Sequence, residues 1–290
     1  MSPIGIVQDA SARMSTGESV SVVIPAYNAA RTIARSVESA FAQTHPVLEV
    51  LVCDDGSTDD TRDVVAGLQQ PAVKWVPCGR NFGPGKPRNI GAAMARGDWL
   101  CFLDSDDSWL PTKLQKQFDA HRETGCQLIA TNALVLRDGT IASQPLLRHP
   151  PARVSFDGLL NDNVVVCSSV MVSREVWLRT QGFPEAREMS AVADYACWLQ
   201  CLLYTDAFVL TEPLVVYSDA PVTSLRSHGV QTLWGQRALV FGHVLQLQKT
   251  LGVKADDTRF RTLRKHWLKA VRRHHGWRAW LSASSAASRD

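Results

Sequence analysis

The chain has 290 residues, of which 45% are hydrophobic and 20% are charged, so it can bury a sizeable core and is neither disordered nor fibrous. Its apolar runs are far shorter than the roughly 20 residues that a membrane-spanning helix needs. Residues 1–19 also lack the apolar stretch of a secretory signal. We therefore expect a cytoplasmic protein that begins with a flexible segment over residues 1–19.

Charge and cysteine content narrow the class of protein further. The net charge is +3, but residues 259–290 contain nine Lys or Arg and one Asp, a charge of +8, which leaves −5 for the rest. The mildly acidic body argues against a general nucleic-acid-binding protein. The basic tail indicates that this segment has a binding partner of its own. The seven cysteines are expected to stay reduced. Cys197 and Cys201 could share one helical face, but two ligands are too few for a metal site.

The first half of the chain alternates strand and helix patterns, as in an open α/β sheet. Strands are predicted over residues 20–24, 48–53, 73–76 and 99–103, and helices over 29–43, 58–68 and 87–95. Beyond residue 111 we predict helices over 113–123, 195–204 and 233–250, strands over 127–130, 164–172 and 214–217, and a hairpin turn at 137–139. Ligands of open α/β sheets bind outside the carboxyl ends of the strands, so polar residues at these ends are candidate site residues.

Three carboxylates follow the strand 99–103 within four residues: Asp104, Asp106 and Asp107. They repel one another, so the chain tolerates them if they are solvated or balanced by a cation. A divalent ion that bridges to a diphosphate is a natural balance. The alternative is a solvated turn in which Asp107 or Ser108 caps the following helix.

A second acidic turn, residues 54–60, follows the strand 48–53. Its Ser57, Thr58 or Asp59 is suited to cap the next helix. Capping does not require Asp55, whose carboxylate is placed to accept the imide N–H of a uracil or the hydroxyls of a ribose.

Two further segments lie at predicted strand ends. Tyr27 comes two residues after Pro25 and offers a stacking surface for a base, although a lone Tyr is more often a packing residue. In residues 81–89, glycines precede a helix start that carries Lys86 and Arg88, two cations suited to phosphates. The spacing matches neither a Walker A loop nor a Rossmann fingerprint.

Together, these four segments resemble a known family in order and spacing. The segments are Val-Ile-Pro-Ala-Tyr-Asn at 23–28, Asp-Asp-Gly-Ser-Thr-Asp-Asp at 54–60, Arg-Asn-Ile-Gly at 88–91 and Phe-Leu-Asp-Ser-Asp-Asp at 102–107. They resemble the inverting glycosyltransferases of family two, and the likeness is dense from about residue 21 to 114. The resemblance implies an α/β fold of the GT-A type, a Rossmann-like mixed sheet flanked by helices.

We therefore predict three regions. The flexible residues 1–19 precede a catalytic domain over 20–220, whose first part, 20–114, binds a nucleotide sugar and whose second part, 115–220, binds the acceptor. A helical, basic C-terminal extension covers residues 221–290.

The resemblance also implies a reaction and its residues. A sugar would pass with inversion from a nucleotide diphosphate, with a UDP-sugar as the expected donor, to the hydroxyl of a saccharide or lipid-linked acceptor in glycan or glycoconjugate biosynthesis. Pro25 and Tyr27 would lie at the base, Asp55 at its imide and Asp104 at the ribose. Lys86 and Arg88 would lie at the phosphates. Asp106 would ligate Mn²⁺ or Mg²⁺ bound to the diphosphate.

The chain departs from the family at two places. Relatives usually carry Glu-Asp at the start of a late helix, where the Asp is the general base; this chain has Ala193 and Asp194. A helix N-terminus favours an ionised carboxylate, which suits a base and also an ordinary capping residue. Many relatives carry a His that reaches the metal or diphosphate where this chain has Ala220, and His228 is either its substitute or a solvated loop residue.

Two other functions remain open. Ala193 and Ala220 would suit a catalytically silent protein that binds nucleotide sugars or acts as a scaffold. A nucleotidyltransferase is a further alternative, but it would normally show a Gly-rich loop after the first strand, which residues 25–28 lack.

The basic tail combines an apolar stripe with flanking cations. The stripe consists of Phe260, Leu263, Trp267 and Val271, and Trp277 and Trp280 follow as candidate interfacial anchors. Either the stripe packs on the catalytic domain, or residues 259–281 rest on an anionic membrane leaflet close to a membrane-bound acceptor.

Overall fold

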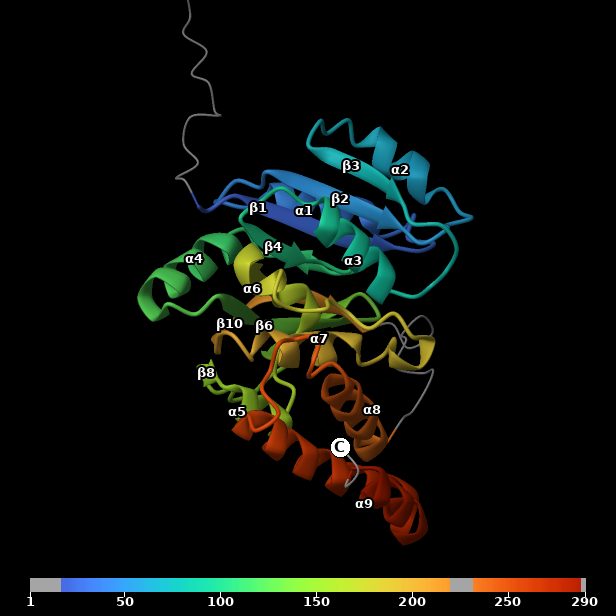
Figure 1. The fold of residues 1–290 in the computed structure, drawn as a ribbon. Helices are drawn as coiled ribbons and strands as arrows, with labels where there is room; N and C mark the ends of the chain where they lie inside the picture. Colours follow the sequence, from blue (N-terminus) through green and yellow to red (C-terminus); the bar gives the residue numbers. More distant parts are fainter. Residues whose placement is uncertain (1–16, 220–231, 288–290) are drawn as a thin grey trace, which may run out of the picture.

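A single sheet organises the part of the chain that the computed structural model describes, residues 17–219 and 232–287, with side chains up to residue 274 (Figure 1). The strand order is β3-β2-β1-β4-β9-β6-β10-β5, with β7 paired to β6 and β8 to β10. The strands are β1 (Val20–Ala26), β2 (Glu49–Asp54), β3 (Val73–Pro77), β4 (Trp99–Phe102), β5 (Ser108–Trp109), β6 (Leu128–Arg137), β7 (Thr140–Pro145), β8 (Arg153–Val154), β9 (Met171–Ser173) and β10 (Ala207–Ser218). β1 to β4 run parallel, so their carboxyl ends meet at one edge.

Helices cover both faces of the sheet, because alternate residues of the strands enter two separate cores. Val22 and Ile24 of β1 pack with α1 (Ile33–Phe41), α2 (Thr61–Gly67) and α4 (Lys113–Thr124). Val23 faces the other core, which contains residues of α3 (Gly85–Met94), α6 (Arg174–Trp177) and α7 (Ala193–Cys201). The alternation follows from the period of two along a strand.

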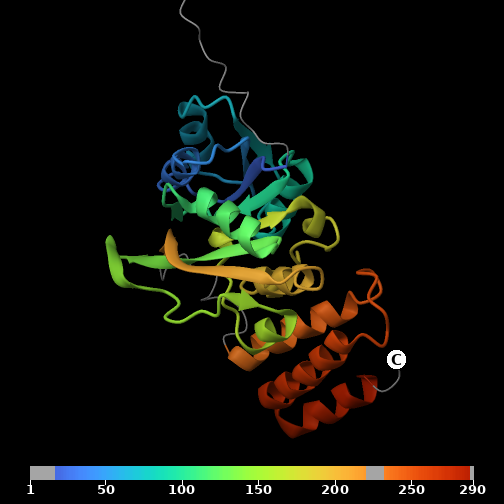
Figure 2. The same cartoon turned by 90° about the vertical axis from the view of Figure 1, so that its left-hand side faces the viewer.

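A helical layer extends this second core away from the sheet. It is formed by α5 (Phe156–Asn161), α8 (Leu233–Gln246) and α9 (Thr258–Ala287), as Figure 2 shows. Phe260, Leu263 and Val271 are buried within the layer. The apolar stripe of the tail therefore faces the protein, which is the first of the two alternatives, and these apolar side chains do not form a membrane-facing surface. The side chains of Trp277 and Trp280 lie outside the described residues.

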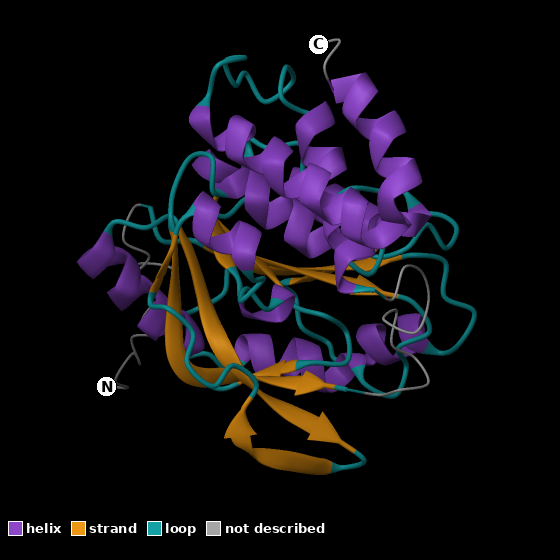
Figure 3. Cartoon of the chain, turned by 90° about the horizontal axis from the view of Figure 1, so that it is seen from below, coloured by secondary structure: helices purple, strands orange, loops and turns teal. Residues whose placement is uncertain are grey.

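Most predicted elements of the first half are confirmed, with shifts of a few residues at their ends. The hairpin at 137–139 is also confirmed: Asp138 and Gly139 have positive φ angles of 51° and 76° and join β6 to β7. In Figure 3 this hairpin projects away from the packed helices.

In the second half, one predicted strand is wrong and another is only part of a longer strand. The apolar run 164–172 is not one strand, because a turn of 3₁₀ helix, Cys167–Ser169, interrupts it before β9 begins at Met171. The strand predicted over 214–217 is the end of β10, which begins at Ala207 and has an irregular register around Pro213.

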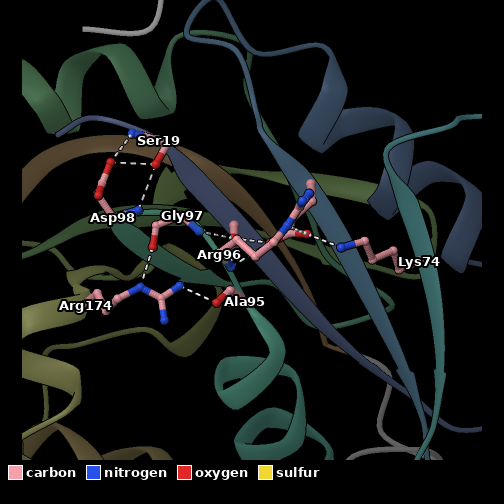
Figure 4. A network of polar contacts seen from close by, with 9 residues as sticks. Ser19, Lys74, Ala95, Arg96, Gly97, Asp98 and Arg174 are labelled. Atoms are coloured by element: carbon pink, nitrogen blue, oxygen red, sulfur yellow. Dashed lines mark hydrogen bonds and ion pairs between the residues drawn. The ribbon is translucent and has the colours of Figure 1, made fainter. Parts of the chain in front are cut away.

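A buried carboxylate ties the amino ends of the strands together, away from the ligand-binding edge. Glu49 accepts hydrogen bonds from Ser21 Oγ (2.8 Å), from Lys74 Nζ (2.7 Å) and from the backbone N–H of Arg96 (2.7 Å). Figure 4 shows Lys74 and Arg96 in this network. Burial alone would raise the pKa of Glu49, but these hydrogen bonds outweigh burial and hold it at about 2.

Two sequence expectations concern cysteines and membrane spans. All seven cysteines are free, as predicted, and all seven are buried. No helix among the described residues combines the length and the apolar character that crossing a membrane requires.

Candidate active site

The carboxyl ends of β1 and β2 form the first wall of the candidate site. Pro25 is buried within β1, whereas the side chain of Tyr27 just beyond the strand is 46% exposed. Asn28 links the two ends: its N–H donates to Ser57 Oγ (2.9 Å), and its side-chain oxygen accepts from the N–H of Thr58 (2.8 Å). Tyr27 is therefore accessible on a loop that neighbouring polar contacts hold in place.

These contacts revise the predicted cap of α2. Ser57 and Thr58 bond to Asn28, as described above, and do not cap the helix. Asp59 accepts from the N–H of Thr61, the first residue of α2 (3.1 Å), and from the N–H of Ala30 (3.1 Å). The N-cap residue of α2 is Asp60, and no side chain makes the capping bond, so the predicted cap by Ser57, Thr58 or Asp59 is not found. Asp59 instead joins the start of α2 to the loop after β1.

Asp55 organises the loop that precedes α3. It is 3% exposed, and its two carboxylate oxygens accept from the N–H groups of Phe82 (3.0 Å) and Gly83 (2.8 Å). Burial raises the pKa of Asp55. Each oxygen keeps a second lone pair, so the carboxylate can accept a further donor from a ligand. On the same loop, Lys86 Nζ lies 3.6 Å from the centroid of the Phe82 ring.

Arg88 is the buried cation at the centre of the site. Its guanidinium forms an ion pair with Asp104 and lies 5.2 Å from the ring centroid of Phe183. Burial alone would lower the pKa of Arg88, but the charges of Asp104 and Asp194 help to raise it above its ordinary value. Its Nε atom is buried without a hydrogen-bond partner among the described residues. Arg88 therefore links α3, the end of β4 and the start of α7 through charge.

The three carboxylates after β4 have different surroundings. Asp106 is partly buried, and burial together with the charge of Asp104 raises the pKa of Asp106 to about 6. Its backbone oxygen accepts from Arg35 Nη2 (2.5 Å). Asp104 is 30% exposed and pairs with Arg88. Asp104 and Asp106 thus form an acidic pair at the ligand-binding edge.

Asp107 is completely buried, so its predicted role as a solvated helix cap is wrong. It accepts hydrogen bonds from the hydroxyl of Ser168 and from the N–H of Ser218 (2.7 Å). Ser168 Oγ also accepts from the N–H of Asp104 (3.1 Å). Asp107 and Ser168 thereby hold the acidic turn against the end of β10. Sequence reasoning missed Ser168 and Arg35, because no motif marks either one.

Asp194 occupies the first turn of α7, after the buried Ala193. One of its carboxylate oxygens accepts from the N–H of Tyr195 (2.7 Å). The helix is held firmly: the Tyr195 hydroxyl donates to the Leu159 oxygen (2.7 Å), and Trp198 packs against Phe183. A half-buried carboxylate is therefore held at the start of a firmly packed helix, and its charge helps to raise the pKa of Arg88.

The described residues contain no group of three His, Cys, Asp or Glu side chains that would hold a metal ion by themselves. The acidic pair Asp104 and Asp106 nevertheless suits a cation that takes its remaining ligands from a diphosphate and water, as Mg²⁺ commonly does. Ala220 and His228 lie outside the described residues.

Comparison with known proteins identifies the family. The family model described as glycosyl transferase family 2 matches residues 21–177, more than half of the chain. The chain is 31% identical over 185 residues, 64% of its length and 70% of the relative, to WfaP of Escherichia coli, the UDP-Glc:α-D-GlcNAc-diphosphoundecaprenol β-1,3-glucosyltransferase.

Two solved structures show the same fold. Residues 1–349 of TarS from S. aureus, in complex with UDP, have a TM-score of 0.65 and 21% identity, over 90% of this chain and 72% of TarS. The mannosyltransferase PcManGT from Pyrobaculum calidifontis, in complex with GDP-Man and Mn²⁺, has a TM-score of 0.57 and 19% identity, over 93% and 79% of the two chains. The family model and the relatives show that the chain belongs to glycosyl transferase family 2, and its sheet and the two solved structures show that it is a glycosyltransferase of the GT-A fold.

Proposed function

We propose that the enzyme transfers a sugar from a UDP-sugar, with inversion and with Mn²⁺ or Mg²⁺, to a hydroxyl of a saccharide or lipid-linked saccharide in polysaccharide biosynthesis. The observation that carries the proposal is the arrangement around Arg88, where Asp104 and Asp194 from two other elements act on one buried cation. WfaP, a relative named for a UDP-Glc donor and a diphosphoundecaprenol-linked acceptor, supports the choice of substrates. We place the reaction at the cytoplasmic face of the membrane.

The donor would bind along the carboxyl ends of β1, β2 and β4. Tyr27 is exposed enough to stack on a base, and Asp55 has lone pairs that can accept the imide N–H of uracil. Asp104 would meet the ribose. Arg88 and Lys86 would lie at the diphosphate, and the unpartnered Nε of Arg88 is a donor that a phosphate oxygen can satisfy.

Asp106, with Asp104 beside it, would hold the divalent ion. The charge of Asp104 helps to raise the pKa of Asp106, and a carboxylate in such surroundings fits a site that a cation completes. When bound, the ion supplies Lewis-acid stabilisation of the charge on the leaving diphosphate. The mannosyltransferase bound to GDP-Man and Mn²⁺ supports such a site in this fold.

Two residues, Asp194 and Arg88, would take part directly in the transfer step. Asp194 would remove the proton from the acceptor hydroxyl as its oxygen attacks the anomeric carbon, and the bond from that carbon to the diphosphate breaks on the opposite side. Arg88 stabilises the negative charge that grows on the departing UDP. A single displacement of this kind inverts the anomeric configuration.

The test is to incubate the purified chain with UDP-, GDP- and dTDP-sugars and Mn²⁺, using free saccharides and diphosphoundecaprenol-linked GlcNAc as acceptors. We expect transfer from a UDP-sugar, loss of transfer on addition of EDTA, and a product whose anomeric configuration, measured by NMR, is inverted. Donor binding without transfer or hydrolysis would instead identify a silent binding protein. Transfer with retained configuration would overturn the inverting mechanism.

A further inference from the structure

Away from the candidate active site, cations gather around one indole at the start of α8. The centroid of the Trp234 ring lies 4.4 Å from Arg273 Cζ, 5.2 Å from Arg237 Cζ and 5.7 Å from Lys269 Nζ. Beside them, Leu268, Lys269, Arg272 and Arg273 line an open hollow. We call the following set the Trp234 patch: Leu233, Trp234, Arg237, Lys269, Arg272 and Arg273.

The patch continues into a positively charged face of α9. Arg261 and Lys265 are exposed, and Arg261, Lys265 and Lys269 follow one another at intervals of about one turn. Neither α8 nor α9 contains an Asp or Glu, so no carboxylate within these helices offsets their cations. The two helices therefore carry an excess of positive charge.

The scaffold under this face is rigid, because the opposite side of α9 is part of the core. Phe260 and Leu263 are buried beneath it. At the patch, by contrast, Leu233 is an exposed apolar side chain, with 56% of its surface accessible. Cations, an indole and an exposed leucine on one surface are the side chains found where proteins meet an anionic membrane.

We propose that the Trp234 patch and the exposed cations of α9 bind the anionic phospholipid headgroups of a bilayer surface. The cations would attract the headgroups, the Trp234 indole would lie at the interface, and Leu233 would enter the acyl boundary. Charge complementarity selects this partner over a neutral or acidic one.

The orientation also suits the enzyme. In Figure 1, α8 begins on the right-hand side of the view, toward which β2 and β3 also point, so the start of α8 and the carboxyl ends of these strands share one side of the molecule. For an acceptor anchored in the membrane, which rests on the proposed function, this contact would bring the site close to its substrate. Binding to the bilayer itself needs neither donor nor acceptor.

The test is co-sedimentation of the full chain with vesicles of phosphatidylcholine alone or mixed with phosphatidylglycerol. We expect binding to the anionic vesicles at low salt, release at high salt, and none to phosphatidylcholine. Lys269→Gln with Arg273→Gln should lower the partition coefficient roughly 30-fold, from the usual contribution of two basic residues. Leu233→Ser should also lower it.

The matched control is Arg62→Gln with Arg179→Gln, which removes two exposed arginines outside α8 and α9. It should stay within about threefold of the parent, because distant charges are screened. Equal loss in both double variants, or equal binding to both kinds of vesicle, would overturn the proposal. Competition by millimolar inorganic phosphate would show a free-anion site and would overturn it as well. Thermal unfolding of the same samples shows whether each variant is folded. The rise in melting temperature on addition of UDP and Mn²⁺ separately shows whether it still binds the donor nucleotide.

Discussion

At the scale of single residues, the buried cation Arg88 explains why two carboxylates lie in its surroundings. A buried guanidinium is costly unless carboxylates balance it, and Asp104 and Asp194 act on it from two different elements. The ion pair with Asp104 leaves the Nε of Arg88 without a partner. The site thus contains a preformed cation with a hydrogen bond still to make, which is suited to an incoming phosphate.

The first prediction concerns the proton acceptor. Asp194→Asn keeps the shape of the side chain but removes its basicity, so kcat should fall by about 10²- to 10⁴-fold, the usual contribution of a general base. Donor affinity, measured by calorimetry with the UDP-sugar, should stay near that of the parent. Parental kcat in the variant would show that another group takes the proton.

The second prediction contrasts two neighbours in the acidic turn. Asp106→Ala should abolish transfer and weaken UDP binding in Mn²⁺, yet leave the melting temperature nearly unchanged, because Asp106 adds little to the core. Asp107→Ala should lower the free energy of unfolding by about 2 kcal/mol, because it leaves Ser168 and the N–H of Ser218 without their acceptor.

Asp107→Asn is the control for this pair, because it retains an acceptor for Ser218 and should lose less stability than Asp107→Ala. Denaturant titrations and metal-dependent transfer assays on all three variants measure both effects. An Asp106→Ala protein that transfers sugar at the parental rate without added metal would contradict the metal assignment.

At the scale of elements, the strand ends were the predictable part. β1, β2 and β4 are apolar runs that stop at polar residues, and this pattern located Tyr27, Asp55 and Asp104 at one edge. The later elements were harder, because a continuous apolar run does not distinguish a strand from a buried turn. Within 164–172, Ser168 lies in a turn of 3₁₀ helix and donates a hydrogen bond to Asp107.

Buried charges were the second difficulty. Asp107, Glu49 and Lys113 are all fully buried, although charged residues normally indicate a surface. Lys113 is tolerated because its Nζ donates to Gln117 Oε1 (2.8 Å) and lies 4.0 Å from the Trp109 ring centroid. The partners of Asp107 and Glu49 come from distant parts of the chain, whereas those of Lys113 lie four residues away on either side. In neither case does the local sequence pattern reveal that the charge is buried.

The third prediction uses the buried carboxylate at the amino ends of the strands. The pKa of Glu49 is lowered from 4.5 to about 2, so its ionised form stabilises the fold above pH 4.5, and this contribution is lost as the pH falls toward 2. Glu49→Gln should therefore lower the free energy of unfolding at pH 7 by about 2 kcal/mol, with allowance for solvent around Lys74 and Arg96.

Urea titrations at several pH values measure this effect. The difference between Glu49→Gln and the parent should shrink as the pH drops below 4.5, because the parent then loses the same charge. Glu212→Gln, in an exposed pair with Lys116, is the control and should change stability by less than about 0.5 kcal/mol. A Glu49→Gln difference that is independent of pH would rule out this carboxylate as the source.

At the scale of the whole molecule, the family likeness and the core have different extents. The family model ends at residue 177, whereas a single core cluster contains Phe102 of β4, Trp198 of α7, Phe241 of α8 and Leu263 of α9. The C-terminal helices are thus built into the same packing as the strand that leads to the acidic turn. Amphipathic spacing revealed a helix in the tail, but it did not reveal which surface its stripe would meet.

The last prediction follows from this shared core. Leu263 is fully buried, so Leu263→Ala should lower the free energy of unfolding by about 3 kcal/mol, from lost burial and the cavity that remains. The exposed Lys265 in the same helix is the control, and Lys265→Ala should change it by no more than about 0.5 kcal/mol. Because one core joins the helices to the sheet, calorimetry should show one cooperative transition that UDP and Mn²⁺ shift upward as a whole in parent and variants. Two separate transitions, of which Leu263→Ala moved only the one insensitive to UDP, would show that α8 and α9 fold independently of the catalytic sheet.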